Sequence, residues 1–113
     1  MKKQLHTIRL AKNNTYTGET AVVTIYNPRH GIAIQVSPDQ LWPYSLLHLL
    51  TSMIISVPVR TLAQARKLQG AYLRLKPRWE DETVNSLQKN TTLVETLKEM
   101  NAPYLERLSV THT

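Results

Sequence analysis

The periodicity of the chain changes at Ser37, and this change constrains the fold more than any other sequence feature. Before it, apolar and polar residues alternate in three short runs that are rich in β-branched side chains. The runs cover residues 6–10, 21–26 and 32–36. Such alternation is typical of strands with one buried face, and Asn, Pro and Gly residues separate the runs as turns. The first 36 residues therefore predict an antiparallel three-stranded meander, with its second hairpin loop near 27–31.

After Ser37, cap residues and prolines with helical spacing replace the alternation. After a short turn over 38–42, helices are predicted over 43–56, 62–75, 79–89 and 92–100, with a last short helix over 104–110. Strands followed by helices favour segregated layers over a parallel sheet. We therefore expect a single α+β domain over 1–113. In it, a small three-stranded antiparallel sheet (1–36) is covered by a helical layer (37–110) of three to four helices.

Charge is distributed unevenly along this basic chain of net charge +6. Residues 1–78 hold 11 basic and 2 acidic side chains, whereas residues 79–113 hold 3 basic and 6 acidic ones. The basic part can attract a polyanion, but the acidic part can equally fold back onto it. Both interpretations stay open at this point.

The expected helix over 62–75 has the clearest division between an apolar and a basic side. Arg60, Lys67 and Arg74 follow one another seven residues apart, opposite the apolar stripe, and Arg78 extends the row. Such a row can follow a phosphate backbone, or it can be an ordinary solvated face. Arg29 and His30, in the expected hairpin loop, are further candidate contacts, although a polar turn explains them as well. Arg60, Lys67, Arg74, Arg78, Arg29 and His30 are thus the predicted nucleic-acid contacts, without sequence specificity.

Residues 41–59 form a run of nineteen residues without a charge. The run is close to membrane-spanning length, but its prolines leave a helix of about 14 residues, roughly 21 Å against a bilayer core of about 30 Å. We therefore expect no membrane span. A helix without charge on its outer face is usually covered there too, by another element or by a partner. The predicted partner interface on that face consists of Tyr44, His48, Thr51 and Ile55. Alternatively, His48 is a hydrogen-bonded histidine of the core.

The chain has no Cys, which excludes disulfide scaffolds, thiolate metal sites and a Cys nucleophile. Its four His residues fall in different expected elements, and no nucleophile, base and orienting residue can be grouped by spacing. We therefore expect no metal, no cofactor and no enzyme activity. The basic N-terminus precedes no apolar run of secretory length, so a cytoplasmic protein is expected.

Two functions remain from these observations. The first is a small, non-enzymatic basic binding module that associates with nucleic acid, or with a nucleic-acid-containing complex, through the basic helix face. The alternative is a protein-interaction module, such as an assembly subunit, an adaptor or an inhibitor of a larger machine, that acts through the uncharged helix or a sheet edge. Edge pairing between two copies would also give a homodimer.

Overall fold

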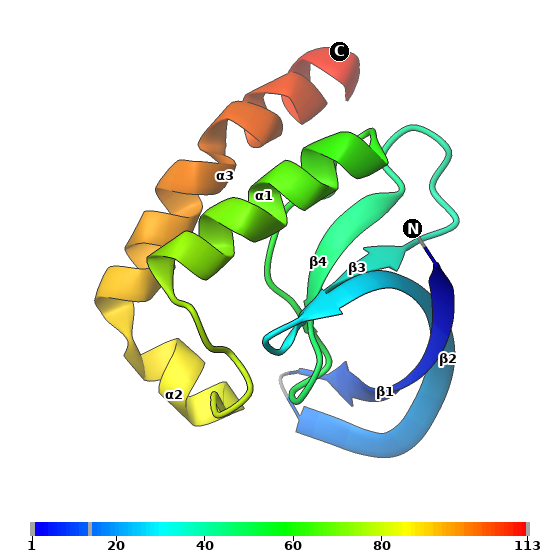
Figure 1. The fold of residues 1–113 in the computed structure, drawn as a ribbon, viewed down its shortest axis with the longest axis vertical. Coiled ribbons are helices and arrows are strands. Elements are labelled where there is room, and N and C mark those ends of the chain that lie inside the picture. The colour runs from blue at the N-terminus through cyan, green and yellow to red at the C-terminus, as the bar shows by residue number, and fades with distance from the viewer. Residues whose placement is uncertain (1, 14, 113) are drawn as a thin grey trace.

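The computed structural model describes residues 2–13 and 15–112, with side chains as far as residue 104. Its elements, drawn in Figure 1, are β1 (Lys3–Lys12), β2 (Thr15–Arg29), β3 (Ile32–Val36), β4 (Tyr44–His48), β5 (Met53–Ile54), α1 (Leu62–Leu75), α2 (Val84–Lys89) and α3 (Thr91–His112). Strands and helices are segregated along the chain, which is typical of an α+β fold. The α+β class is confirmed.

The sheet has five antiparallel strands in the order β1-β2-β3-β4-β5, so the prediction of a three-stranded sheet is wrong. The two extra strands, β4 and β5, come from the segment 43–56 that was expected to be a helix. Leu46, Leu47 and His48 are consecutive and all fully buried, which means that β4 is covered on both faces. A strand buried on both faces reads as a continuous apolar run, and periodicity does not distinguish such a run from a buried helix.

The β1–β2 hairpin is long and strongly curved, and Figure 1 shows it bending around one side of the sheet. A register shift between Arg9 and Ala11 lies near its distal end. This end returns to the β4–β5 turn, where the Arg9 N–H donates to Ser52 Oγ at 2.9 Å and the Tyr16 hydroxyl donates to the Thr51 carbonyl at 2.5 Å. The hairpin therefore covers the face of β3 and β4 that the helices leave open.

Two clusters of buried side chains follow from this arrangement. On the helical side, β3 and β4 pack against α1, Trp79 and the two later helices; the buried members are Ile32, Ile34, Leu46, Val59, Ala65, Leu68, Tyr72, Trp79, Leu87 and Leu93. On the hairpin side, Ile25, Ala33 and Leu47 pack with Ile8, Val23 and Leu49. Burial on both sides makes β3 and β4 the centre of the molecule.

The helix α1 forms as predicted, because its signals are local. Thr61 Oγ1 accepts from the Gln64 N–H at 3.1 Å, and Gln64 Oε1 accepts from the Thr61 N–H, which completes the capping box. The helix α2 is shorter than predicted, since Trp79 lies in the preceding loop, where its N–H donates to the His30 carbonyl.

The helix α3 continues through Pro103, so the break expected at residues 101–103 is wrong. Asn101 explains why this segment stays docked on the core. Its side chain is buried, accepts from the Val57 N–H at 3.2 Å and donates to the Tyr72 hydroxyl at 2.7 Å. Within residues 2–13 and 15–112, no helix combines the length and the apolar character that crossing a membrane requires.

Candidate nucleic-acid interface

The solvent face of α1 is basic. The helix turns Ala65, Leu68, Gln69 and Tyr72 inward, and this places Lys67 and Arg74 on the opposite, exposed side. Arg66 is exposed beside Lys67 and was not among the predicted contacts, although its position next to Lys67 in the sequence was a usable signal. We define the basic face as Arg60, Arg66, Lys67 and Arg74.

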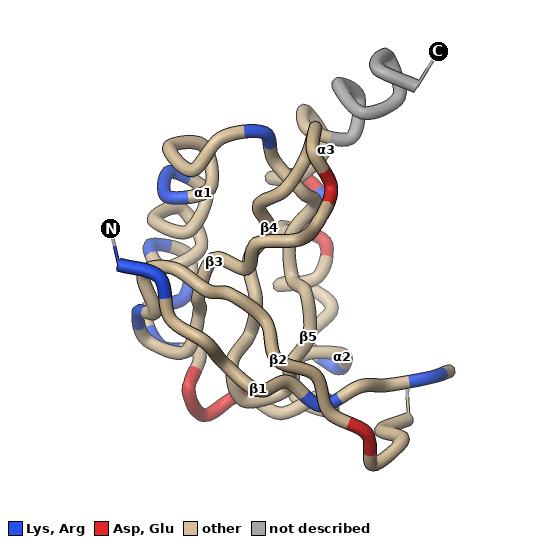
Figure 2. Tube along the Cα trace, turned by 90° about the vertical axis from the view of Figure 1, so that its right-hand side faces the viewer, with Lys and Arg blue, Asp and Glu red and all other residues tan. Residues whose placement is uncertain are grey.

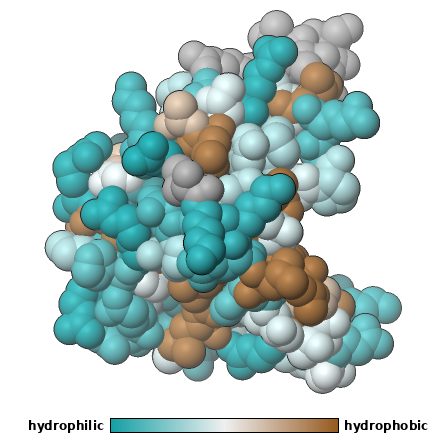
Figure 3. Space-filling model, turned by 45° about the vertical axis from the view of Figure 1, so that its right-hand side comes forward, coloured by the Kyte–Doolittle hydropathy of each residue, from teal (hydrophilic) through white to brown (hydrophobic). Residues whose placement is uncertain are grey.

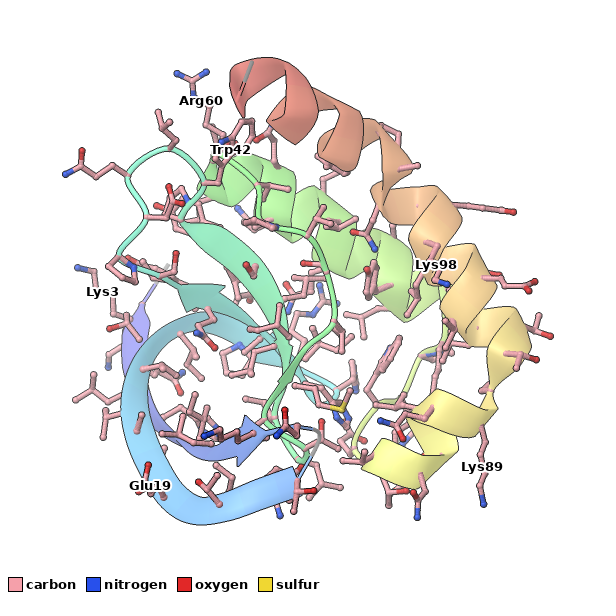
Figure 4. All side chains as sticks on the ribbon, turned by 180° about the vertical axis from the view of Figure 1, so that it is seen from behind. Lys3, Glu19, Trp42, Arg60, Lys89 and Lys98 are labelled. Carbon is pink, nitrogen blue, oxygen red and sulfur yellow. The ribbon has the colours of Figure 1, made fainter. Side chains whose placement is uncertain are left out.

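Arg60 lies just before the N-cap Thr61, so the row of cations is helical only from Lys67 to Arg74. Seven residues of helix separate these two side chains by about 10 Å along the axis. An added Cβ at Gly70 would lie 3.4 Å from Arg74 Nη1, so the guanidinium of Arg74 lies back over the helix surface at Gly70. Arg60 extends away from the ribbon in Figure 4.

The four cations of the basic face make no ion pair with any described acidic side chain. Beyond the end of α1 the situation is different, because Lys76 Nζ lies 2.5 Å from Glu82 Oε1 and the Arg78 guanidinium contacts Glu80 and Asp81. Arg78 was predicted to continue the row. It lies among carboxylates instead, which neutralise part of its charge.

In this cluster, the carboxylate of Glu82 is bound by both Lys76 and Ser86. The hydrogen bond from Lys76, with a smaller contribution from Ser86, lowers the pKa of the Glu82 carboxyl. The carboxylate therefore stays ionised beside Lys76. In Figure 2, the Lys and Arg positions follow α1 along one side of the molecule, and acidic positions lie at its lower end and on α3.

Arg29 and His30 lie at the β2–β3 turn, where His30 has a φ of 49° and Gly31 a φ of 90°. The two predicted residues are exposed. His30 Nδ1 is 3.5 Å from Glu80 Oε1, so His30 and Arg78 share one carboxylate. The predicted contacts thus fall into two groups, the basic face of α1 and the mixed-charge loops beyond its C-terminal end.

The predicted partner residues lie in the interior. His48 and Thr51 are 0% and 3% exposed, and Tyr44 and Ile55 are half-buried against the core. His48 Nε2 donates to the Trp79 carbonyl at 2.5 Å, since a carbonyl oxygen can only accept, and Nδ1 forms a hydrogen bond of 2.7 Å with the Thr51 hydroxyl. His48 is therefore a hydrogen-bonded core histidine. A partner interface over these four residues stays a prediction.

In the described part of the chain, no three His, Asp or Glu side chains gather as a metal site would require. No protein-family model matches the chain, and neither the curated proteins nor the solved structures give a match. Function must therefore be inferred from the charge, the burial and the contacts of this chain alone.

Proposed function

We propose that this protein is a small, non-enzymatic module that binds nucleic acid through the basic face of α1. The observation that carries the proposal is the contrast between two sets of neighbouring cations. Arg60, Arg66, Lys67 and Arg74 are exposed and lack acidic partners among the described residues, while Lys76 and Arg78 have them. Cations that no described carboxylate neutralises are suited to phosphate groups, and α1 holds three of these four, Arg66, Lys67 and Arg74.

The contacts expected from such a face are electrostatic. Guanidinium groups donate two parallel hydrogen bonds to a phosphate, and each neutralised phosphate releases condensed counterions. The sequence contains no motif of a recognition helix or of an RNA-binding platform, so binding is expected to depend strongly on salt and little on sequence.

The alternative, in which the acidic part of the chain folds back and neutralises the basic part, is weakened by where the acids lie. Glu80, Asp81 and Glu82 contact Lys76, Arg78 and His30, which lie outside the basic face. In the protein-interaction alternative, β4 and β5 replace the predicted helix. The interface over Tyr44, His48, Thr51 and Ile55 and the sheet-edge form both remain proposals. A cytoplasmic location also remains a proposal.

The test is a salt titration of binding to short, unrelated duplexes and single strands. Four phosphate contacts predict a slope of log affinity against log salt of about −3.6 on duplex DNA and about −2.8 on single strands. Changing Lys67→Gln and Arg74→Gln together should reduce the slope by about 1.4 to 1.8, with little change in stability, since both side chains are exposed.

The matched control is Lys89→Gln together with Lys98→Gln. It removes the same net charge from exposed positions that Figure 4 places on the other side of the molecule from Arg60. The control should keep the wild-type slope. Undetectable wild-type binding at about 50 mM salt, or equal losses in the two double variants, would return the basic face to an ordinary solvated surface.

A further inference from the structure

A groove of about 590 Å³ lies between the distal end of the β1–β2 hairpin, strand β5 and helix α2. Its lining is mostly apolar and includes Ile8, Leu10, Ala11, Ile54 and Val84. Figure 3 shows apolar surface gathered around a hollow at the right-hand side of that view. The volume is within the range of about 300–1,000 Å³ that is typical of ligand sites.

A second, smaller hollow of about 180 Å³ continues from the groove. It shares Met53, Ile54 and Gln88 with the groove and extends along α3 to Val94 and Leu97. The two hollows therefore flank β5, the last strand of the sheet. A ligand that fits both must be long and must run along this edge.

The backbone of β5 is open on the groove side. The Ile55 N–H donates to the Leu46 carbonyl, so the N–H and the carbonyl of Ile54 point away from β4 by the alternation of an antiparallel ladder. No described residue pairs with them as a further strand, because β5 is at the end of the sheet. An unpaired edge of this kind is a template for an additional strand.

Two polar groups at the hollows can take a further hydrogen-bond acceptor. The Arg9 guanidinium lies 4.1 Å from the centre of the Tyr16 ring and donates to the Leu50 carbonyl, yet no described acid contacts it. Trp79 lines the smaller hollow, and its buried indole N–H has no acceptor among the described residues. A carboxylate and a carbonyl oxygen are the groups that would complement them.

We propose that the edge of β5 and its two hollows bind an extended, acidic segment of a partner protein. The segment pairs with the backbone of Ile54, places alternate apolar side chains in the hollows and directs a carboxylate toward Arg9. A second copy of this chain suits the site less well, because its β1 edge carries Lys3 and Arg9 and its net charge is +6. This site is separate from the basic face of α1.

The probe is a synthetic octapeptide of alternating valine and threonine with aspartate at both ends, acetylated and amidated, so that either strand direction presents a carboxylate. A first comparison peptide has its central amides N-methylated, and a second carries asparagine in place of aspartate.

Titration of the protein with the octapeptide, followed by NMR, should show chemical-shift changes at β5 and α2. N-methylation should weaken binding about tenfold, because it removes hydrogen bonds to the sheet edge. Asparagine should weaken it several-fold, and Arg9→Gln should abolish this difference.

The matched protein variants are Ile54→Pro and Leu5→Pro. Each removes a backbone N–H that points away from the neighbouring strand. For Leu5 this follows from Arg9, which lies four residues further along β1 and whose N–H donates to Ser52 rather than to β2. Ile54→Pro should lose about tenfold in affinity for the octapeptide, whereas Leu5→Pro should bind like wild type. Both should keep the wild-type salt dependence on nucleic acid. If Ile54→Pro does not fold, the N-methylated peptide alone decides the question.

Three results would overturn the proposal. The first is no detectable binding of the octapeptide at millimolar concentration, and the second is equal binding of the N-methylated peptide. The third is a wild-type dimer in sedimentation that Ile54→Pro dissociates, because the occupant of the edge would then be a second copy.

Discussion

Gly31 and Gly18 both have positive φ angles, of 90° and 86°, in very different surroundings. A Cβ at Gly31 would lie 2.7 Å from backbone atoms of Trp79 and Glu80, whereas a Cβ at Gly18 would meet nothing within 4 Å. Gly18→Ala should therefore cost only the strain of the left-handed backbone, about 1–2 kcal/mol. Gly31→Ala should cost about 1–3 kcal/mol more, because the Trp79 loop has to move. Urea unfolding of the two variants measures the difference, and equal losses would mean that the close approach is absent.

Tyr72 makes the free energy of unfolding depend on pH in the alkaline range. Burial raises the pKa of its hydroxyl to about 12, and the hydrogen bond from Asn101 offsets only part of this effect. In the unfolded chain the pKa is about 10, so the stabilisation is fully present below pH 10. It is lost as the pH rises from about 10 to about 12, by up to about 3 kcal/mol, because the unfolded state releases its proton first.

The measurement is urea unfolding of wild type and Tyr72→Phe at steps from pH 8 to pH 12. The Phe variant is the control for the other Tyr and Lys groups that titrate in this range. It should be less stable at pH 8, where Tyr72 bonds to Ile55 and Asn101, and the gap should close as the pH rises. A gap that stays constant up to pH 12 would contradict the burial of an ionisable hydroxyl.

At the scale of the element, Thr61 and Thr92 both stand near the start of a helix, and only Thr61 is a cap. For α3 the cap is Asn90, whose Oδ1 accepts from the Leu93 N–H at 3.1 Å. Thr61→Ala should therefore cost about 1 kcal/mol, while Thr92→Ala should change stability by no more than about 0.5 kcal/mol. Thermal unfolding of the two variants tests this, and a loss of about 1 kcal/mol in Thr92→Ala would mean that Thr92 also caps α3.

The elements also show how far the sequence predicts this fold. The helix α1 and the exposed side of Lys67 and Arg74 follow from caps and periodicity alone, since both depend on residues close in sequence. The strand β4 was missed because its burial on both faces depends on α1 and on the distant β1–β2 hairpin. The pairing of Arg78 with Glu80 and Asp81 was missed for a related reason, because it depends on the conformation of a loop.

At the scale of the whole molecule, the β1–β2 hairpin is tied to the rest of the sheet at its distal end by few contacts. The hydrogen bond from the Tyr16 hydroxyl to the Thr51 carbonyl is one of them. Tyr16→Phe should speed amide exchange at the distal end of the hairpin by about threefold to tenfold, as expected for the loss of one net hydrogen bond of about 1 kcal/mol. Amides of β3 should exchange as in wild type.

The control for this prediction is Tyr26→Phe. Its hydroxyl makes no hydrogen bond to another described residue, although its ring packs against the core. Exchange at the distal hairpin should be unchanged in this variant. Acceleration of equal size in both variants, or acceleration that extends to β3, would mean that the hairpin does not open separately from the sheet.

The order of strands before helices has a consequence during synthesis. All five strands are complete at Ile54, but the helices and Trp79 that cover the main face of the sheet lie in the next 60 or so residues. At about 5–20 residues per second, translation leaves that face uncovered for roughly 3–12 s. The apolar strand Ile32–Val36 is exposed on that face during this time, and such segments aggregate when exposed. A growing chain of this protein is therefore most in need of a holding chaperone after its sheet has been made and before α1 and Trp79 have emerged from the ribosome.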